Sequence, residues 1–259
     1  MKLTISELQN IETEIVKELA EICKRNNIDY FLHCGSALGA IRHKGPIPWD
    51  TDVDVIVPYN QYEAVISALR KELSDKFYVD YYDENKDYPL LFARIGLKGY
   101  STHILHVDIF KLVGISADIQ QQEKLLKQAQ LCRNLYRPKK KKQEYFGKIA
   151  FPYNVILFLQ KIVLSPFSTK TLVRRFEKLC SIVPFEEAEY VTNLNGHYGA
   201  KNIIRKSYYG KGTFANYGGI EVKIPEKYDP YLRHYYGDYM RLPDADKRKV
   251  KDYYQIIEK

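Results

Sequence analysis

Three aspartates at alternating positions are the residues of this chain whose type and spacing best suit chemistry. Asp50, Asp52 and Asp54 lead into the apolar run 55–57. Alternate side chains of a strand share one face, so Asp52 and Asp54 are expected to project together. Two carboxylates this close repel each other unless a cation lies between them, and such pairs hold Mg²⁺ together with substrate phosphates. The pattern predicts a metal-assisted phosphate site, although acid pairs at strand ends are also common in solvated turns.

The segment before the acids contains groups that bind phosphate. The apolar run 30–32 is predicted to form a strand that ends near Gly35 and Ser36, and a short helix is expected over 37–42. A glycine–serine turn at the start of a helix presents backbone N–H groups and a hydroxyl to a phosphate. We therefore expect this turn to form part of the same site.

Asp108 is a further acid in an apolar setting. It lies within the predicted strand 107–110, between valine, isoleucine and phenylalanine. An unpaired carboxylate buried there is costly. Asp108 is therefore expected either to lie at a strand edge in water, or to act as a third metal ligand or general base.

Motifs at both ends of the chain suggest a family. Residues 35–45 read Gly-Ser-Ala-Leu-Gly-Ala-Ile-Arg-His-Lys-Gly, and 47–55 read Ile-Pro-Trp-Asp-x-Asp-x-Asp-Val. This run closely resembles the LicD family of phosphotransferases, which includes fukutin and fukutin-related protein. The resemblance extends to 106–110 and to the C-terminal stretches 220–232 and 236–243.

The resemblance implies a nucleotidyltransferase fold and a phosphoryl transfer reaction. Family members move a phospho-alcohol, often phosphocholine, from a CDP-linked donor to a glycan hydroxyl and release CMP. For this chain it implies phosphocholine transfer to a cell-surface glycan precursor such as teichoic acid, lipopolysaccharide or capsule, on a lipid-linked acceptor. Ribitol, glycerol or sugar phosphates remain alternatives. Trp49 and the 23 tyrosines supply aromatic rings for a choline ammonium.

The resemblance also implies residue roles. Asp52 and Asp54 would bind Mg²⁺ (or Mn²⁺), and Asp108 would complete the metal site or take the proton of the acceptor hydroxyl. Asp50 would be an additional metal-binding or supporting acid. The remaining candidates would hold the donor phosphates, although a solvated basic loop is the alternative for the central three: Gly35, Ser36, Arg42, His43, Lys44 and Arg94.

The length, composition and charge of the chain limit its class of fold and its cellular location. The 259 residues are 45% hydrophobic and 28% charged, which is ordinary for a globular chain. Four cysteines without metal-ligand spacing are expected to be reduced thiols, and residues 1–10 contain no apolar signal core. We therefore expect a cytoplasmic protein. The net charge of +8 favours an anionic partner.

The expected fold class is α/β (α+β), a nucleotidyltransferase-like mixed sheet flanked by helices. We divide the chain into a catalytic core (1–115), a helical basic and apolar segment (116–185), and a Tyr/Gly-rich part that completes the active-site face (186–259). In the middle segment, four lysines at 139–142 precede the apolar stretch 151–167. That stretch is too short and polar to span a bilayer. It is either a buried helix or an interfacial helix on an anionic membrane.

Three other functions remain open at this point. A metal-dependent Asp-x-Asp glycosyltransferase would use a nucleotide sugar, but we would expect it to begin with a nucleotide-binding strand rather than the helix predicted over 5–24. An RNA nucleotidyltransferase fits the positive charge and would bind nucleic acid with strong salt dependence; no nucleic acid is expected under the main hypothesis. A non-catalytic protein with a decayed site would lack the acids that are present here.

Overall fold

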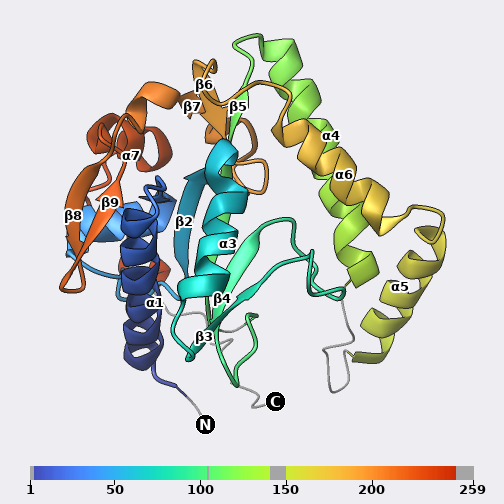
Figure 1. The fold of residues 1–259 in the computed structure, drawn as a ribbon, viewed down its shortest axis with the longest axis horizontal. Coiled ribbons are helices and arrows are strands. Elements are labelled where there is room, and N and C mark those ends of the chain that lie inside the picture. The colour runs from blue at the N-terminus through green and yellow to red at the C-terminus, as the bar shows by residue number, and fades with distance from the viewer. Residues whose placement is uncertain (1–2, 104, 141–149, 249–259) are drawn as a thin grey trace.

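The computed structural model describes residues 3–103, 105–140 and 150–248. A mixed β-sheet lies between groups of helices (Figure 1), as the expected α/β class requires. Its strands are β1 (Phe31–Leu32), β2 (Val53–Pro58), β3 (Phe77–Asp80), β4 (Ala93–Leu97), β5 (His106–Ile115), β6 (Tyr190–Thr192) and β7 (Ile204–Arg205).

The order of the sheet is β1-β2-β5-β4-β3, and β6 and β7 continue it from the far end of β5. The two central strands, β2 and β5, are parallel, and the other pairs are antiparallel. All ten residues of β5 are buried. This explains why Asp108 occurs within a continuous apolar run, because a central strand is covered on both faces.

The register of the central strands brings distant charges together. Asp54 of β2 is paired with Asp108 of β5, and Asp108 is paired on its other side with Arg94 of β4. Side chains of directly paired residues project from the same face of a sheet. Asp54, Asp108 and Arg94 therefore form a charged row across three strands.

Helix α1 (Ile5–Arg25) packs against the sheet layer and against α3 (Tyr62–Glu72). A capping box begins α1, because Thr4 and Glu7 exchange side-chain to backbone hydrogen bonds. Beside α1 lie the hairpin of β8 (Thr213–Tyr217) and β9 (Ile220–Ile224) and helix α7 (Tyr228–Tyr236) (Figure 1). These C-terminal elements belong to the same hydrophobic core as α1 and the sheet.

On the other side stand α4 (Ile119–Lys140), α5 (Ala150–Val163) and α6 (Thr169–Cys180), with α5 outermost (Figure 1). Residues of α4 and α6 form a second hydrophobic cluster with the end of β5. Lys111 of β5 anchors this group, because its buried ammonium lies 2.5 Å from a carboxylate oxygen of Glu177 on α6. Aromatic rings surround the same ammonium, Tyr62 at 4.8 Å and Tyr81 at 5.3 Å.

Helix α5 is exposed rather than buried on most of its surface. Six of its large apolar side chains are 41–71% exposed, whereas Leu157 is buried, and the exposed set continues into Phe167 beyond the helix. Among the described residues, no helix has both the length and the apolar character needed to cross a bilayer. Of the predicted lysine run, Lys139 and Lys140 end α4, and Lys141 and Lys142 lie outside the described residues.

Two local predictions need correction. Helix α2 (Cys34–Leu38) starts at Cys34, three residues earlier than expected, and continues as a π-helical turn over Gly39–His43. Asp52 lies before β2 rather than within it, so it is a loop residue and does not share a strand face with Asp54. The alternating acids therefore do not share one strand: Asp50 and Asp52 lie in the loop before β2, and Asp54 lies within β2.

Candidate active site

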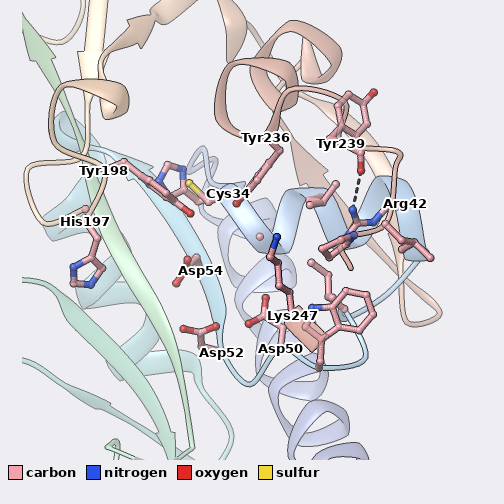
Figure 2. Close-up of a pocket in the computed structure, with 18 of the residues that line it drawn as sticks. Cys34, Arg42, Asp50, Asp52, Asp54, His197, Tyr198, Tyr236, Tyr239 and Lys247 are labelled. Carbon is pink, nitrogen blue, oxygen red and sulfur yellow. Dashed lines mark hydrogen bonds between the residues drawn. The ribbon is translucent and has the colours of Figure 1, made fainter. Parts of the chain in front are cut away.

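A cavity of about 840 Å³ lies where α2, the start of β2 and the C-terminal segment meet. Asp50, Asp52 and Asp54 all line it (Figure 2). The opposite wall comes from the C-terminal half and includes Tyr236 and Lys247. The structure thus brings the three predicted acids of the first motif to one cavity, although only Asp54 belongs to a strand.

Gly35 lies against Asp50 in this cavity. A Cβ atom at position 35 would lie 3.1 Å from Oδ2 of Asp50, closer than side chains normally pack. Gln9 of α1 fixes the neighbouring loop, since its side-chain amide donates to the carbonyls of Ile47 and Asp50 at 2.9 and 2.8 Å. The glycine therefore leaves room for the close approach of Asp50, and it lies on the cavity wall.

Ser36 has a different place from the one expected. It is buried, it is outside the cavity lining, and its Oγ accepts a hydrogen bond of 2.8 Å from the backbone N–H of Asp54. The serine therefore holds the start of β2 against α2. In this structure it positions Asp54 and does not face the cavity.

Repulsion among the acids shapes the electrostatics of the site. Burial raises the pKa of Asp54 well above its usual value, and the charges of Asp52 and Asp108 raise it further. Beneath them lies Glu12 of α1, 1% exposed, whose pKa is raised by burial and by the same aspartates. Glu12 was not predicted as a site residue, although its position on the apolar face of α1 between Leu8 and Ile15 was a signal.

Asp108 is held by a cation. Its Oδ1 lies 2.7 Å from Nε of Arg94 and 3.5 Å from Nε2 of His106. Burial raises the pKa of Asp108, and attraction to Arg94 opposes this effect. Arg94, predicted to bind phosphate, thus has an acidic partner. Both residues line a second cavity of about 470 Å³, which adjoins the first because Asp52 lines both.

Of the basic stretch, only Arg42 reaches the first cavity. Its Nη1 donates to the carbonyl of Tyr239 at 2.8 Å (Figure 2). Its Nε lies 2.9 Å from Nε2 of His43. His43 packs edge-on against Trp49, with 5.6 Å between ring centroids, and Lys44 is exposed. The structure does not bring His43 and Lys44 to the cavity.

Several wall residues were not predicted individually. His197 and Tyr198 come from the loop after β6, and Tyr236 and Lys247 come from α7 and the segment beyond it (Figure 2). The signals for this wall were the tyrosine- and glycine-rich composition after 186 and the family resemblance over 236–243. Trp49, singled out in the sequence, also lines the cavity.

The donor set suits a hard divalent cation, since carboxylate oxygens are the ligands that Mg²⁺ takes. In the part of the chain that the structure describes, no three histidine, cysteine or carboxylate side chains are grouped closely enough to hold one ion. A pair of carboxylates remains, as in sites where substrate phosphates supply further ligands. The raised pKa of Asp54 fits such a site, because a cation between the acids would relieve their repulsion.

Comparisons with known proteins agree with this geometry. A family model described as the LicD/FKTN/FKRP nucleotidyltransferase domain matches residues 27–168. The lipopolysaccharide cholinephosphotransferase LicD of Haemophilus influenzae is 25% identical over 262 residues, which cover 96% of each chain. Uncharacterized proteins of Rickettsia prowazekii and Rickettsia typhi are 43% identical over 42 residues, 16% of this chain.

The matched region contains α2, β2, β4 and β5, and so it contains every acid of the site except Glu12. Fold and match together define a nucleotidyltransferase domain. Because the match covers more than half of the chain, the chain belongs to the LicD family. The resemblance expected from the Gly-Ser and Asp-x-Asp-x-Asp motifs is thereby confirmed.

Proposed function

We propose that this enzyme transfers phosphocholine from CDP-choline to a hydroxyl of a cell-surface glycan precursor and releases CMP. The observation that carries the proposal is the convergence of Asp50, Asp52 and Asp54 on one cavity that also has aromatic and basic walls. A full-length relative named as a lipopolysaccharide cholinephosphotransferase supports phosphocholine as the transferred group.

The first cavity suits the donor. Its volume of about 840 Å³ lies within the range of small-molecule sites. Arg42, Arg241 and Lys247 line it and supply positive charge for a pyrophosphate. Trp49 and Tyr236 line it as well and offer ring faces to a quaternary ammonium.

Mg²⁺ is the metal we propose, held by Asp52 and Asp54. When bound, it would neutralise charge on the donor phosphates, which is the main requirement of phosphoryl transfer. The chain's own contribution is position. The 2.8 Å bond from the N–H of Asp54 to Ser36 fixes the start of β2, and the missing side chain of Gly35 lets Asp50 approach.

Asp108 is better placed to receive the acceptor's proton than to bind the donor. It lines the second cavity but not the first, and it is the register partner of Asp54. Arg94, at 2.7 Å, orients the carboxylate. We assign Asp108 as the group that accepts the hydroxyl proton of the acceptor while the donor occupies the first cavity.

We further propose that the enzyme works in the cytoplasm at the inner face of the membrane, through α5 and the residues that follow it. The exposed apolar residues there are Val155, Ile156, Phe158, Leu159, Ile162, Val163 and Phe167. Lys139 places a cation beside them, since its Nζ lies 2.6 Å from the carbonyl of Leu164. An apolar surface next to lysines suits an anionic bilayer, where a lipid-linked glycan would be found.

Membrane contact is tested by sedimentation with vesicles of phosphatidylcholine and phosphatidylglycerol. We expect Phe158→Ser combined with Ile162→Ser to reduce the bound fraction severalfold. Phe214→Ser, which removes an exposed aromatic ring from β8, is the matched control and is expected to bind normally. Equal binding of the wild type and the α5 variant would refute this part of the proposal.

The reaction is tested with a panel of donors at fixed Mg²⁺, with release of CMP or UDP as the readout. We expect turnover of CDP-choline, stimulated by a glycan acceptor and abolished by chelation. Turnover of CDP-ribitol or CDP-glycerol instead would identify another phospho-alcohol. Activity with UDP-sugars alone would refute the assignment in favour of a glycosyltransferase.

A further inference from the structure

The second cavity has a wall that the proposed reaction does not yet explain. Four polar residues of α4 line it: Gln130, Arg133, Asn134 and Arg137. Their spacing of three, one and three residues places them on one face of the helix. The apolar residues Leu125, Ala129, Cys132 and Tyr136 form the other face of α4, which packs in the second hydrophobic cluster. The polar face is therefore separate from the packing of the helix.

The arginines of this wall have little to neutralise them. Among the described residues, Arg133 has a long contact of 3.5 Å from its Nη1 to the carbonyl of Gly196, and Arg137 has no carboxylate partner. Burial lowers the pKa of both, and the positive charge of Arg137 lowers that of Arg133 further. Arg94, which lines the same cavity, is neutralised by Asp108. Two guanidinium groups thus remain for an outside anion.

A buried amide without a hydrogen-bond partner also indicates an anion site in this cavity. Asn195 lines the cavity and is 7% exposed, and its Nδ2 has no hydrogen-bond partner among the described residues. A buried donor without an acceptor is costly. Oxygen atoms of a bound anion would satisfy this amide and the two arginines together.

From these contacts we propose that the second cavity binds an anionic group, a phosphate or a carboxylate, on the acceptor sugar. Its volume of about 470 Å³ holds a sugar ring as well as the anion. Asp52 and His197 line both cavities, so a hydroxyl of this sugar would face the donor across their boundary. This inference rests on the proposed function, because it takes the first cavity as the donor site.

Calorimetric titration of the full chain tests the inference with three probes: glucose 6-phosphate, glucuronate and glucose. We expect at least one of the two anionic sugars to bind, and glucose to bind at least tenfold more weakly. Arg133→Gln combined with Arg137→Gln should weaken the anionic probe at least tenfold. Lys124→Gln combined with Lys127→Gln removes the same charge from exposed positions of the same helix, and it should leave binding within twofold of the wild type.

The outcomes separate the two proposals. Equal affinity of the wild type and the arginine variant, or equal affinity for glucose and both anions, would overturn the inference. Competition between CMP and the anionic probe would also overturn it, because the probe would then occupy the donor cavity. Arginine-dependent binding in a protein that turns over no CDP-linked donor would refute the proposed reaction but not the anion site. Thermal melting of each variant confirms that it is folded.

Discussion

Tyr231 of α7 holds the backbone of Cys34, 197 residues earlier in the chain, with its hydroxyl oxygen 3.0 Å from the backbone nitrogen. The same hydroxyl lies 2.8 Å from Nδ1 of His33, within hydrogen-bond distance. Cys34 has a φ of +44°, an uncommon value for a residue with a side chain. The C-terminal helix therefore fixes the strained turn from which α2, with Gly35 and Ser36, begins.

Removal of this hydroxyl is the first test of that relationship. Tyr231→Phe leaves the N–H of Cys34 without its partner inside a buried site, and Nδ1 of His33 keeps only the longer contact of 3.4 Å to the hydroxyl of Tyr209. We expect a loss of about 1–3 kcal/mol in the free energy of unfolding and a lower kcat, measured by urea denaturation and CMP release.

Tyr235 is the matched control on the same helix. Its hydroxyl is buried and its one polar neighbour among the described residues is the thiol of Cys34, a weak hydrogen-bond partner, so Tyr235→Phe should cost much less than Tyr231→Phe. Similar losses in both variants would show that the hydroxyl of Tyr231 has no special role.

Gly35→Ala tests whether the bare backbone at position 35 lets Asp50 reach the cavity. The new Cβ would lie 3.1 Å from Oδ2 of Asp50, and a displaced acid is expected to reduce kcat by about 10- to 100-fold. In an Asp50→Ala background the clash is absent, so Gly35→Ala should have little further effect. Strict additivity of the two changes in log kcat would contradict this account.

Part of the site could be predicted because it depends on short-range patterns. The apolar run after Asp54 predicts a buried strand, and the position of Asp108 in a second apolar run predicts a mostly buried strand. Family motifs then identify both acids as members of one site. The adjacency of β2 and β5, however, comes from a parallel pairing that no local pattern specifies.

Other parts depend on tertiary placement. Ser36 looks like a phosphate ligand in the sequence, but the register of β2 against α2 uses its hydroxyl for the N–H of Asp54. His43 ends the π-helical turn and Lys44 follows it, and neither side chain lines the cavity. A helical segment was predicted over 116–185, but the polar face of α4 as a cavity wall was not. Which face of this helix lines a cavity depends on how the helix packs, and no local pattern specifies that packing.

Asp54→Asn is expected to trade activity for stability. The side chain loses its charge in a buried cluster whose members repel one another, so the free energy of unfolding without metal at pH 7 should rise. Turnover should fall at least about 100-fold, because a proposed metal ligand is lost.

Glu12→Gln is the control that separates the effect of Asp54→Asn on stability from its effect on turnover. Glu12 is buried beneath the aspartates and is outside the lining of the first cavity. We expect it to stabilise the protein similarly, with kcat within a few fold of the wild type. Normal turnover in Asp54→Asn would refute the role assigned to that acid.

His33 predicts how stability changes with pH. Burial lowers its pKa to about 3, whereas in the unfolded chain the value is about 6.5. Between these values the unfolded state binds a proton that the folded state does not, so this contribution to stability is complete above pH 6.5 and is lost as the pH falls. From pH 7 to pH 5 the loss is about 2 kcal/mol. In His33→Gln the amide oxygen can still accept from Tyr231, and the loss from other groups is common to both proteins. We therefore expect the wild type to lose about 2 kcal/mol more than the variant over this interval in denaturant titrations, and parallel pH profiles would show that His33 is protonated in the folded protein.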